Sequence, residues 1–316
     1  ETGCLLVGKT TNPPIIDGIL KEDCWEKSIE VCPFILINQP KFAKEQTKAY
    51  LTYDKDNLYI SYRCEEICLD PVENQLGAFK KETTRNDDDN IFSDDCVVIL
   101  LDTDLDMDTF YDIFVNGLGI INDAVCGGRN PWGSRDKKWN SNAKVFSKIE
   151  EGYWVVEISI PFSSLGVQPK EGDIWGICLG RIEQNRKESS VWQPMKVGFH
   201  NAKEFGRIVF GNKVPGIKSV NMGDFTYGKN QLTATIMPPI TDTPFYLRIE
   251  TDITFANERK NISFDDYKLL KEGKLNYTYS LDKSGDFSFR YKVLNPCSFE
   301  TYYSSPVYDA SVKANT

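Results

Sequence analysis

The chain has 316 residues but only one histidine, His200, and four methionines. Its nine cysteines include no Cys-x-x-Cys pair, so a zinc site made of cysteine and histidine would lack ligands. No Gly-x-Ser-x-Gly elbow, Walker loop or dinucleotide-binding fingerprint is present. His200 is also the only side chain suited to act as a base near neutral pH. These absences argue against an enzyme.

Long apolar runs and clusters of positive charge are missing as well. No run of eighteen apolar residues occurs, so we predict no membrane-spanning segment. The net charge of −9 and the lack of any Lys/Arg-rich run argue against a nucleic-acid partner. A neutral ligand, a cation or a basic protein patch suits such a surface better. The first three residues, Glu-Thr-Gly, resemble a remnant left after removal of a secretion leader.

The cysteine pattern is typical of an oxidising compartment. Eight of the nine cysteines precede residue 180, and Cys297 is left over. We therefore predict at least two disulfide bonds, with undefined connectivity, in a secreted or cell-surface protein. The alternative for Cys96 and Cys178, which lie in apolar segments, is that they are buried thiols. Two glycosylation sequons, Asn261-Ile-Ser and Asn276-Tyr-Thr, agree with an extracellular location.

Short strand-like segments separated by turn residues fill the chain, and long helical periodicity is absent. Thr47–Tyr53 and Leu58–Arg63 alternate in polarity around a turn at 54–57, which predicts a β-hairpin. Val97–Leu101 is a continuous apolar run, as expected of a central strand covered on both faces. A short helix is predicted around Trp25. The other predicted strands of this region are Phe110–Val115, Gly119–Ala124, Ala143–Ile149, Tyr153–Ile160, Ile174–Gly180 and Phe205–Phe210.

The polar, turn-rich segment 211–216 predicts a domain boundary, which divides the chain into residues 4–212 and 213–316. Short strands also follow one another in the second part, and Leu281–Asp286 is predicted to form a hairpin turn. The predicted strands there are Asp224–Tyr227, Gln231–Met237, Phe245–Phe255, Lys274–Ser280 and Phe287–Val293. We therefore predict an all-β protein, in which a larger β-sandwich is followed by a smaller, immunoglobulin-like β-sandwich.

Residues 10–211, about two thirds of the chain, resemble the CBM9-like (DOMON-like) domains related to family 9 carbohydrate-binding modules. The marks that carry the resemblance occur in the order typical of that family. They are Pro14-Ile-Ile-Asp-Gly, the segment around Trp25, Leu51–Ser61, Ser93-Asp-Asp with Asp102, Val115-Asn-Gly-Leu-Gly, Asn122-Asp-Ala, Trp154–Phe162, Trp175-Gly, Arg181, Trp192, Phe199-His-Asn and Phe205-Gly. The resemblance implies a β-sandwich that binds glycan ends without catalysis, on one rim of the fold.

Such a rim needs flat rings that stack on the apolar faces of sugars and polar groups that replace the water around the hydroxyls. The resemblance places this site on the segment 181–193. Gln184 and Asn185 would contact hydroxyls, Arg181 or Arg186 would brace an oxygen, and Trp192 would stack. The alternatives are that Trp192 is a core residue and that Arg181 forms a buried pair with Glu188 or Glu157.

Further aromatic residues complete the predicted rim. Trp132 and Trp139, in or near a glycine-rich loop, are candidates for a second wall, and their flanking residues favour exposure for Trp132. Sugar-binding members of the family typically carry a tryptophan just before the Ser-Asp-Asp strand, but Ile91-Phe92 stands there, so Phe92 would have to substitute. The remaining tryptophans, Trp25, Trp154 and Trp175, lie in patterned segments and are predicted core residues.

The segment 102–108 carries carboxylates at every second position. They belong to Asp102, Asp104, Asp106 and Asp108. The spacing resembles a calcium loop, but Met107 and Ile113 stand where an EF-hand requires glycine and glutamate. We therefore predict either calcium bound by oxygen ligands or a solvated acidic turn.

The sequence leaves two functions open. The first is a non-catalytic extracellular protein that recognises glycan, and the alternative is a cell-surface adhesion or receptor ectodomain that binds a protein partner. Haem binding through Met195 and His200 is a weaker rival, since the related DOMON sandwiches hold haem through Met and His.

Overall fold

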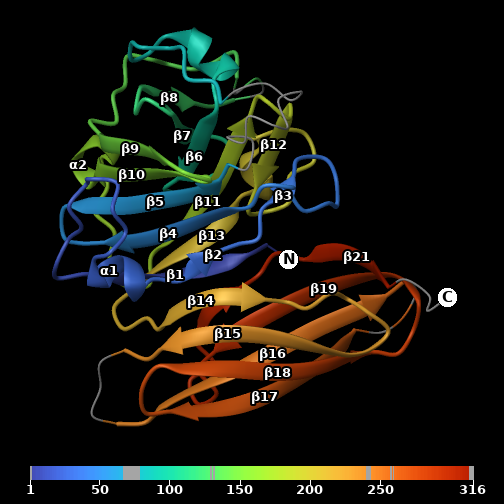
Figure 1. Ribbon diagram of the computed structural model, residues 1–316. Coiled ribbons are helices and arrows are strands. Elements are labelled where there is room, and N and C mark those ends of the chain that lie inside the picture. Colours follow the sequence, from blue (N-terminus) through green and yellow to red (C-terminus); the bar gives the residue numbers. More distant parts are fainter. Residues whose placement is uncertain are drawn as a thin grey trace.

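The computed structural model describes residues 2–66, 79–128, 130, 132–239, 243–256, 258 and 260–312. Strands dominate the described residues, and the few helices are single turns. Two layered β units lie one above the other, the first coloured blue to yellow and the second orange to red (Figure 1). The predicted all-β class is therefore confirmed.

The first unit is a sandwich of two sheets. One sheet has the strand order β8–β7–β6–β11–β13–β1, with the short hairpin strand β12 also paired to β11 and to β3. These strands are β1 (Cys4–Lys9), β3 (Ile35–Leu36), β6 (Cys96–Asp102), β7 (Phe110–Asn116), β8 (Ile121–Cys126), β11 (Ile174–Glu183), β12 (Glu188–Val191) and β13 (Gly206–Gly211).

The second sheet of this unit has the strand order β9–β10–β5–β4–β2, and β1 also touches β4, so β1 joins the two sheets at one edge. Its strands are β2 (Glu30–Val31), β4 (Thr47–Tyr53), β5 (Asn57–Glu65), β9 (Lys144–Glu150) and β10 (Tyr153–Pro161). The single-turn helices are α1 (Asp23–Glu26), α2 (Phe162–Leu165), η2 (Asp89–Ser93) and η3 (Ala202–Glu204).

The core of the first unit follows the hydrophobic pattern of the sequence. Every residue of β6 is buried between its neighbours β7 and β11, as predicted for a central strand. The β4–β5 hairpin is also confirmed. The predicted core tryptophans Trp25, Trp154 and Trp175 are all buried. Trp25 anchors α1, because its Nε1–H donates to the buried carboxylate of Glu157 at 2.8 Å.

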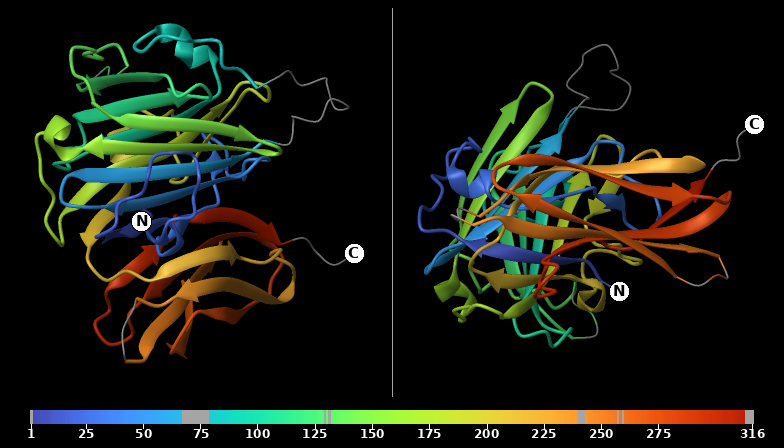
Figure 2. Two further views of the ribbon diagram at one scale, coloured as in Figure 1. Left: turned by 60° about the vertical axis from the view of Figure 1, so that its left-hand side comes forward. Right: turned by 90° about the horizontal axis from the view of Figure 1, so that it is seen from below.

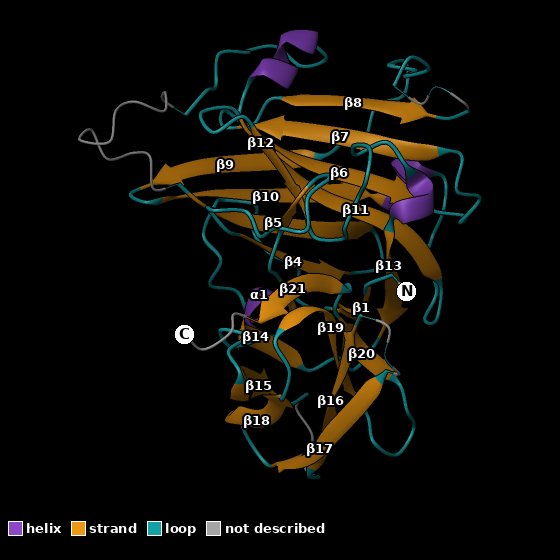
Figure 3. Ribbon diagram, turned by 90° about the vertical axis from the view of Figure 1, so that its right-hand side faces the viewer, coloured by secondary structure: helices purple, strands orange, loops and turns teal. Residues whose placement is uncertain are grey.

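The second unit also consists of two sheets whose strands alternate between buried and exposed residues. Its strands are β14 (Gly216–Asn221), β15 (Gly228–Met237) and β18 (Gly273–Leu281) in one sheet, and β16 (Phe245–Phe255), β17 (Asn261–Leu269), β19 (Gly285–Leu294), β20 (Thr301–Ser304) and β21 (Tyr308–Val312) in the other. Figures 1 and 3 show both sheets below the first unit. The immunoglobulin-like assignment stays a prediction.

Two local predictions in the second unit are wrong. Residues 224–227 form no strand. Leu281–Asp286 is not a hairpin turn, because β18 pairs with β15 whereas β19 pairs with β16. The turn residues there mark a change of direction, but alternation along a strand does not say which strand is its partner.

The two units share one sheet. β1 pairs in parallel with β13 and antiparallel with β20, where Leu5 faces Tyr303. The first strand of the chain therefore lies between the two units, and the N-terminus is seen at that level in the left-hand view of Figure 2. The connection between β13 and β14 spans the predicted boundary at 212/213, and that boundary stays a prediction.

The predicted disulfide bonds are wrong for the described residues. Eight cysteines are described, and none of them is paired; Cys68 lies outside the described residues. Cys96 donates to the carbonyl of Ile91 at 3.3 Å, and the Cys178 sulfur lies 3.4 Å from that of Met195. These two residues behave as buried thiols, which was the open alternative. Among the helices described, none is both long and apolar enough to cross a membrane.

Candidate functional site

The eight predicted ligand-binding residues do not meet on one rim. Trp192 lies between the two units, and three polar residues of the segment 181–186 lie in a buried ion-pair network. Gln184 and Trp139 are partly buried elsewhere, and only Trp132, which is exposed, and Phe92 pack against each other at the surface. Each location has a physical cause.

Trp192 is completely buried, so the prediction that it stacks on a ligand is wrong. Its Nε1–H donates to the hydroxyl of Tyr303 at 3.0 Å, and the two rings lie 6.1 Å apart. Its ring also fills the space left by two glycines. A Cβ on Gly206 would lie 2.7 Å from this ring, and one on Gly3 would lie 2.9 Å from it. Trp192 therefore joins the first unit to the second.

Arg181 and Asn185 are buried against one carboxylate, so their predicted contact with ligand is also wrong. Arg181 Nη2 lies 2.6 Å from Glu66 Oε2, and Asn185 Nδ2 donates to Glu66 Oε1 at 3.1 Å. The alternative of a buried ion pair is correct for Arg181, but its partner is Glu66, not Glu188 or Glu157. A buried charge needs such a partner because desolvation is otherwise too costly.

Arg186 extends the same network. Its guanidinium lies 2.7 Å from Glu45 and 3.0 Å from Glu183, so it too is a structural residue. Burial raises the pKa of Glu66 to about 7, although the Arg181 charge opposes this rise. Burial likewise raises the pKa of Glu183 to about 8, and the nearby Glu45 charge adds to the effect of burial. Glu66 and Glu183 therefore keep their protons to a higher pH than ordinary carboxyl groups do.

Gln184 and Trp139 are partly buried and used within the fold. Gln184 Nε2 donates to the carbonyl of Phe92 at 2.9 Å. Trp139 packs on Tyr111 with ring centroids 4.6 Å apart, and its Nε1–H donates to the carbonyl of Ser164 at 2.8 Å. Both side chains hold loops in place, and their predicted contact with ligand stays a prediction.

Trp132 is the predicted aromatic residue that does reach the surface, with 48% of its area exposed. Its ring meets that of Phe92 at 4.8 Å and that of His200 at 4.7 Å, almost perpendicular to the latter. The guanidinium of Arg135 lies 5.6 Å from the Trp132 ring and 5.1 Å from the Phe92 ring. Cation–π attraction and edge-to-face packing therefore hold the indole in one orientation.

The base of this group is the carboxylate of Asp112 on β7. Arg135 binds it through Nε at 2.7 Å and Nη2 at 2.9 Å, and His200 Nε2 lies 2.9 Å away. Burial alone would raise the pKa of Asp112, but hydrogen bonds from His200 and Arg135 and the Arg135 charge hold it below its usual value. We call Phe92, Asp112, Trp132, Arg135 and His200 the Trp132 cluster.

The sequence offered a weak signal for the missed members of this cluster. Asp112 is a carboxylate inside an otherwise apolar strand, and such a group needs a buried cation as partner. Nothing local shows that Arg135, twenty-three residues later, supplies that charge. The alternation of β7 does place Asp112 and Phe114 on one face.

The cluster is arranged for binding rather than nucleophilic chemistry. The nearby thiol of Cys126 lies 3.2 Å from Asp112 and donates a hydrogen bond to that carboxylate. Burial raises the pKa of Cys126, so the reactive thiolate is disfavoured. The atoms needed for the haem alternative are also engaged, because His200 Nε2 contacts Asp112 and Met195 contacts Cys178.

The acidic loop after β6 brings three of its four aspartates together. The carboxylates of Asp102, Asp104 and Asp106 offer oxygens within 4.8 Å of one another. Asp108 does not belong to this group. Both oxygens of Asp102 already accept backbone N–H groups, from Leu105 at 2.7 Å and from residue 107 at 3.1 Å. The geometry is compatible with oxygen ligation, and calcium stays a prediction.

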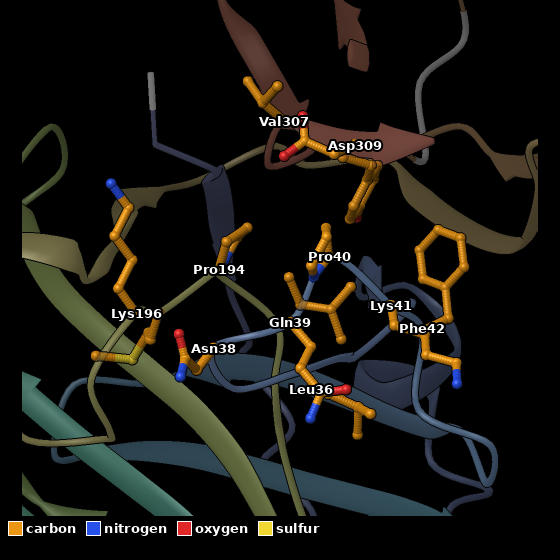
Figure 4. A pocket seen from close by; sticks show the side chains of 13 residues that line it. Leu36, Asn38, Gln39, Pro40, Lys41, Phe42, Pro194, Lys196, Val307 and Asp309 are labelled. Carbon is orange, nitrogen blue, oxygen red and sulfur yellow. The ribbon is translucent and has the colours of Figure 1, made fainter. Parts of the chain in front are cut away.

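A separate cavity of about 370 Å³ lies at the junction of the two units (Figure 4). Leu36, Phe42 and Tyr308 give it apolar walls, and the rings of Phe42 and Tyr308 pack edge to face at 5.6 Å. Lys196 and Asp309 lie at its sides. Such walls suit hydrocarbon groups better than the hydroxyls of a neutral sugar.

Comparisons with known proteins agree with the first unit. Residues 16–213 match the model of the carbohydrate family 9 binding domain-like family. A putative carbohydrate-binding protein from Bacteroides uniformis is 15% identical, with a TM-score of 0.51, over 66% of this chain and 100% of that one. This likeness supports the fold.

Two CBM9 structures from Caldicellulosiruptor kristjanssonii are also similar. One, in complex with cellotriose, is 16% identical with a TM-score of 0.45, over 66% of this chain and 94% of that one. The other, in complex with glucose, is 17% identical with a TM-score of 0.45, over 70% of this chain and 100% of that one. No curated protein matches the chain. The family model covers well over half of the sequence, and the chain therefore belongs to the carbohydrate family 9 binding domain-like family.

Proposed function

We propose that this protein binds glycan without catalysis, through the exposed face of Trp132. The observation that carries the proposal is the indole itself, which is half exposed yet fixed by Phe92, Arg135 and His200. An immobilised flat ring loses little entropy when a pyranose stacks on it. Membership of a binding-domain family supports the same reading.

Polar groups that could bracket sugar hydroxyls lie next to the cluster. Asp89 is well exposed, and its carboxylate pairs with Lys137 and lies 3.8 Å from Arg135. The carboxylate of Asp89 and the ammonium group of Lys137 can exchange water for sugar hydroxyls at a small cost in free energy, because both already contact solvent. The site thus combines one apolar face with a hydrogen-bond donor and a hydrogen-bond acceptor, and a neutral sugar needs all three.

We also propose that the protein acts outside the cell. Both sequon asparagines, Asn261 on β17 and Asn276 on β18, are exposed and can accept a glycan. The family relationship does not address location, so this part rests on the sequons. Mass spectrometry of secreted protein, before and after glycosidase treatment, tests it.

A glycan array followed by calorimetric titration tests the binding site. We expect Trp132→Ala to weaken glycan binding about 5- to 30-fold, the equivalent of about 1–2 kcal/mol of stacking. Tyr227→Ala is the matched control, because Tyr227 is 51% exposed but belongs to the second unit. Full affinity in the Trp132 variant, or an equal loss in the Tyr227 variant, would contradict the proposal.

A protein partner is the second candidate function, and one observation favours it. Among the described residues β17 pairs only with β16, and it exposes Ile262 and Phe264. A partner could add an extended segment along this free edge. Phe264→Asp should then abolish cell-surface binding and leave glycan binding unchanged, whereas Trp132→Ala should do the reverse.

A further inference from the structure

A second concave surface lies where the two units meet, on the side of α1 and β14 (Figure 1). This cleft has a volume of about 810 Å³, within the range of small-molecule sites. Its walls come from the segment 18–21, from the outer faces of β4, β5 and β10, and from β14 and β15. It shares none of its lining residues with the Trp132 cluster.

The side chain of Arg63 extends along the wall of this cleft. Its guanidinium carbon lies 4.0 Å from the centre of the Tyr153 ring, on the neighbouring strand. Among the described residues, Arg63 has no carboxylate oxygen within salt-bridge distance. In contrast, the guanidiniums of four other arginines, at 135, 181, 186 and 248, each pair with a carboxylate. Within the described part of the chain, the forked donor edge of Arg63 therefore has no carboxylate acceptor.

Lys218 brings a second cation to the same cleft. Its Nζ donates to the carbonyl of Trp25 at 2.5 Å and lies 4.0 Å above the ring of Tyr50. Burial lowers the pKa of Lys218 to about 8, with the Glu30 charge opposing that change. Glu30 itself is engaged by the hydroxyl of Tyr50 at 2.8 Å and by Lys48 at 3.2 Å. The described residues offer Lys218 no carboxylate within 4.0 Å.

The remaining lining explains why an anion with a sugar-like body fits. Lys148 is paired with Glu150, so these two charges offset one another. Ser219 and Thr235 supply hydroxyl groups, and Val155 with Met237 supplies apolar surface. Glu26 and Glu272 also line the cleft, but neither lies within 4.0 Å of the charged nitrogens of Arg63 or Lys218. Two cations without a carboxylate partner among the described residues, hydroxyls and hydrocarbon therefore face one space. A desolvated cation gains most from a ligand that brings a negative charge.

We propose that this cleft binds an acidic sugar, a monosaccharide unit that carries a carboxylate. The planar carboxylate would pair with the guanidinium of Arg63, whose fork matches it in two parallel hydrogen bonds. Lys218 would add long-range attraction, and the hydroxyls of the cleft would contact those of the ligand. The choice of a sugar rests on the proposed function, whereas the anion site stands on the geometry alone.

Calorimetric titration with a glucuronate-containing disaccharide tests the inference. Its uncharged glucose counterpart and a sulfated counterpart of the same linkage serve as comparison ligands. We expect the wild type to bind the glucuronate ligand at least tenfold more tightly than the neutral one, with an affinity that falls as salt rises. Arg63→Gln should weaken it about ten- to a hundredfold, as expected for loss of a charged hydrogen bond. Arg63→Lys should retain part of the affinity.

Two further variants keep the test decisive. Lys218→Met removes a buried charge without opening a cavity, so it should fold and still weaken binding of the acidic ligand. Trp132→Ala should leave that binding intact, which separates this cleft from the glycan site. Equal affinity for neutral and acidic ligands, no binding of the acidic ligand, or no effect of Arg63→Gln in a folded protein would overturn the proposal. Tighter binding of the sulfated ligand would overturn the carboxylate assignment.

Discussion

Replacement of Trp192 by alanine should destabilise the protein and leave glycan recognition intact in the folded fraction. The indole is completely buried, and its ring fills the space against Gly3 and Gly206. Truncation of a buried tryptophan to alanine typically costs about 3–5 kcal/mol, because the lost contacts leave a cavity. Loss of the hydrogen bond to Tyr303 adds about 1 kcal/mol. We expect a total decrease in the free energy of unfolding of about 4–6 kcal/mol.

Two milder variants separate packing from hydrogen bonding. Trp192→Phe keeps most of the ring but removes its N–H, and Tyr303→Phe removes the acceptor of the same bond. We expect each to lower the free energy of unfolding by about 1–2 kcal/mol. Because both substitutions remove the same hydrogen bond, the double variant should lose less free energy of unfolding than the sum of the two single variants.

Urea unfolding monitored by fluorescence gives these values, and calorimetric titration at low temperature gives the glycan affinity per folded molecule. A Trp192→Ala variant that matched the stability of the wild type within about 0.5 kcal/mol but no longer bound glycan would contradict a structural role of Trp192. That pattern belongs to an exposed stacking residue. It would mean that Trp192 is a ligand contact after all.

Three further predictions concern charged groups. Burial raises the pKa of Glu66 to about 7 and of Glu183 to about 8, so between these values and the ordinary pKa the folded state holds protons that the unfolded chain has lost. The contribution of these two groups to the free energy of unfolding should be greatest below about pH 4.5 and should fall as the pH rises to about 8. The fall should be at most about 1.4 kcal/mol per pH unit and group. Glu66→Gln and Glu183→Gln should flatten this slope in urea unfolding, and an unchanged slope would contradict the assignment. Asp112→Asn should cost about 3–5 kcal/mol, because it takes from the buried Arg135 charge its closest carboxylate and leaves only Asp89 at 3.8 Å. A loss below about 1 kcal/mol would argue against a desolvated pair. Finally, millimolar calcium should raise the melting temperature of the wild type, and a chelator should reverse the rise. The double variant Asp104→Asn with Asp106→Asn should respond to neither. Identical melting curves of the wild type with calcium and with chelator would mean that the segment is only a solvated acidic turn.

Many of the strands and the three tryptophans of the core could be predicted from the sequence. The hairpin β4–β5, the fully buried strand β6 and the buried Trp25, Trp154 and Trp175 all follow from local patterns. Alternation with a period of two identifies a half-buried strand wherever it stands, and a continuous apolar run identifies a central one. These signals are complete within a few residues, so no distant contact is needed to interpret them.

The candidate site could be read only in part. Exposure of Trp132 was expected from its loop, but the group that fixes its ring was not. Asp112, Arg135 and His200 lie far apart in the chain and meet only because β7 and two loops converge. Likewise, the cysteine count suggested disulfide bonds, yet whether two thiols meet depends on which strands place them side by side.

Local sequence patterns are enough to show that this protein is built of strands and which side chains those strands bury. Tertiary structure decided what the polar and aromatic residues do. Trp192 has the same local pattern whether it faces solvent or Tyr303, which lies 111 residues away. Arg181 pairs with Glu66 across 115 residues, a partner that no local pattern reveals. Burial along a patterned strand is encoded locally, whereas the burial of loop residues such as Trp192 and the identity of each contact depend on how distant segments pack.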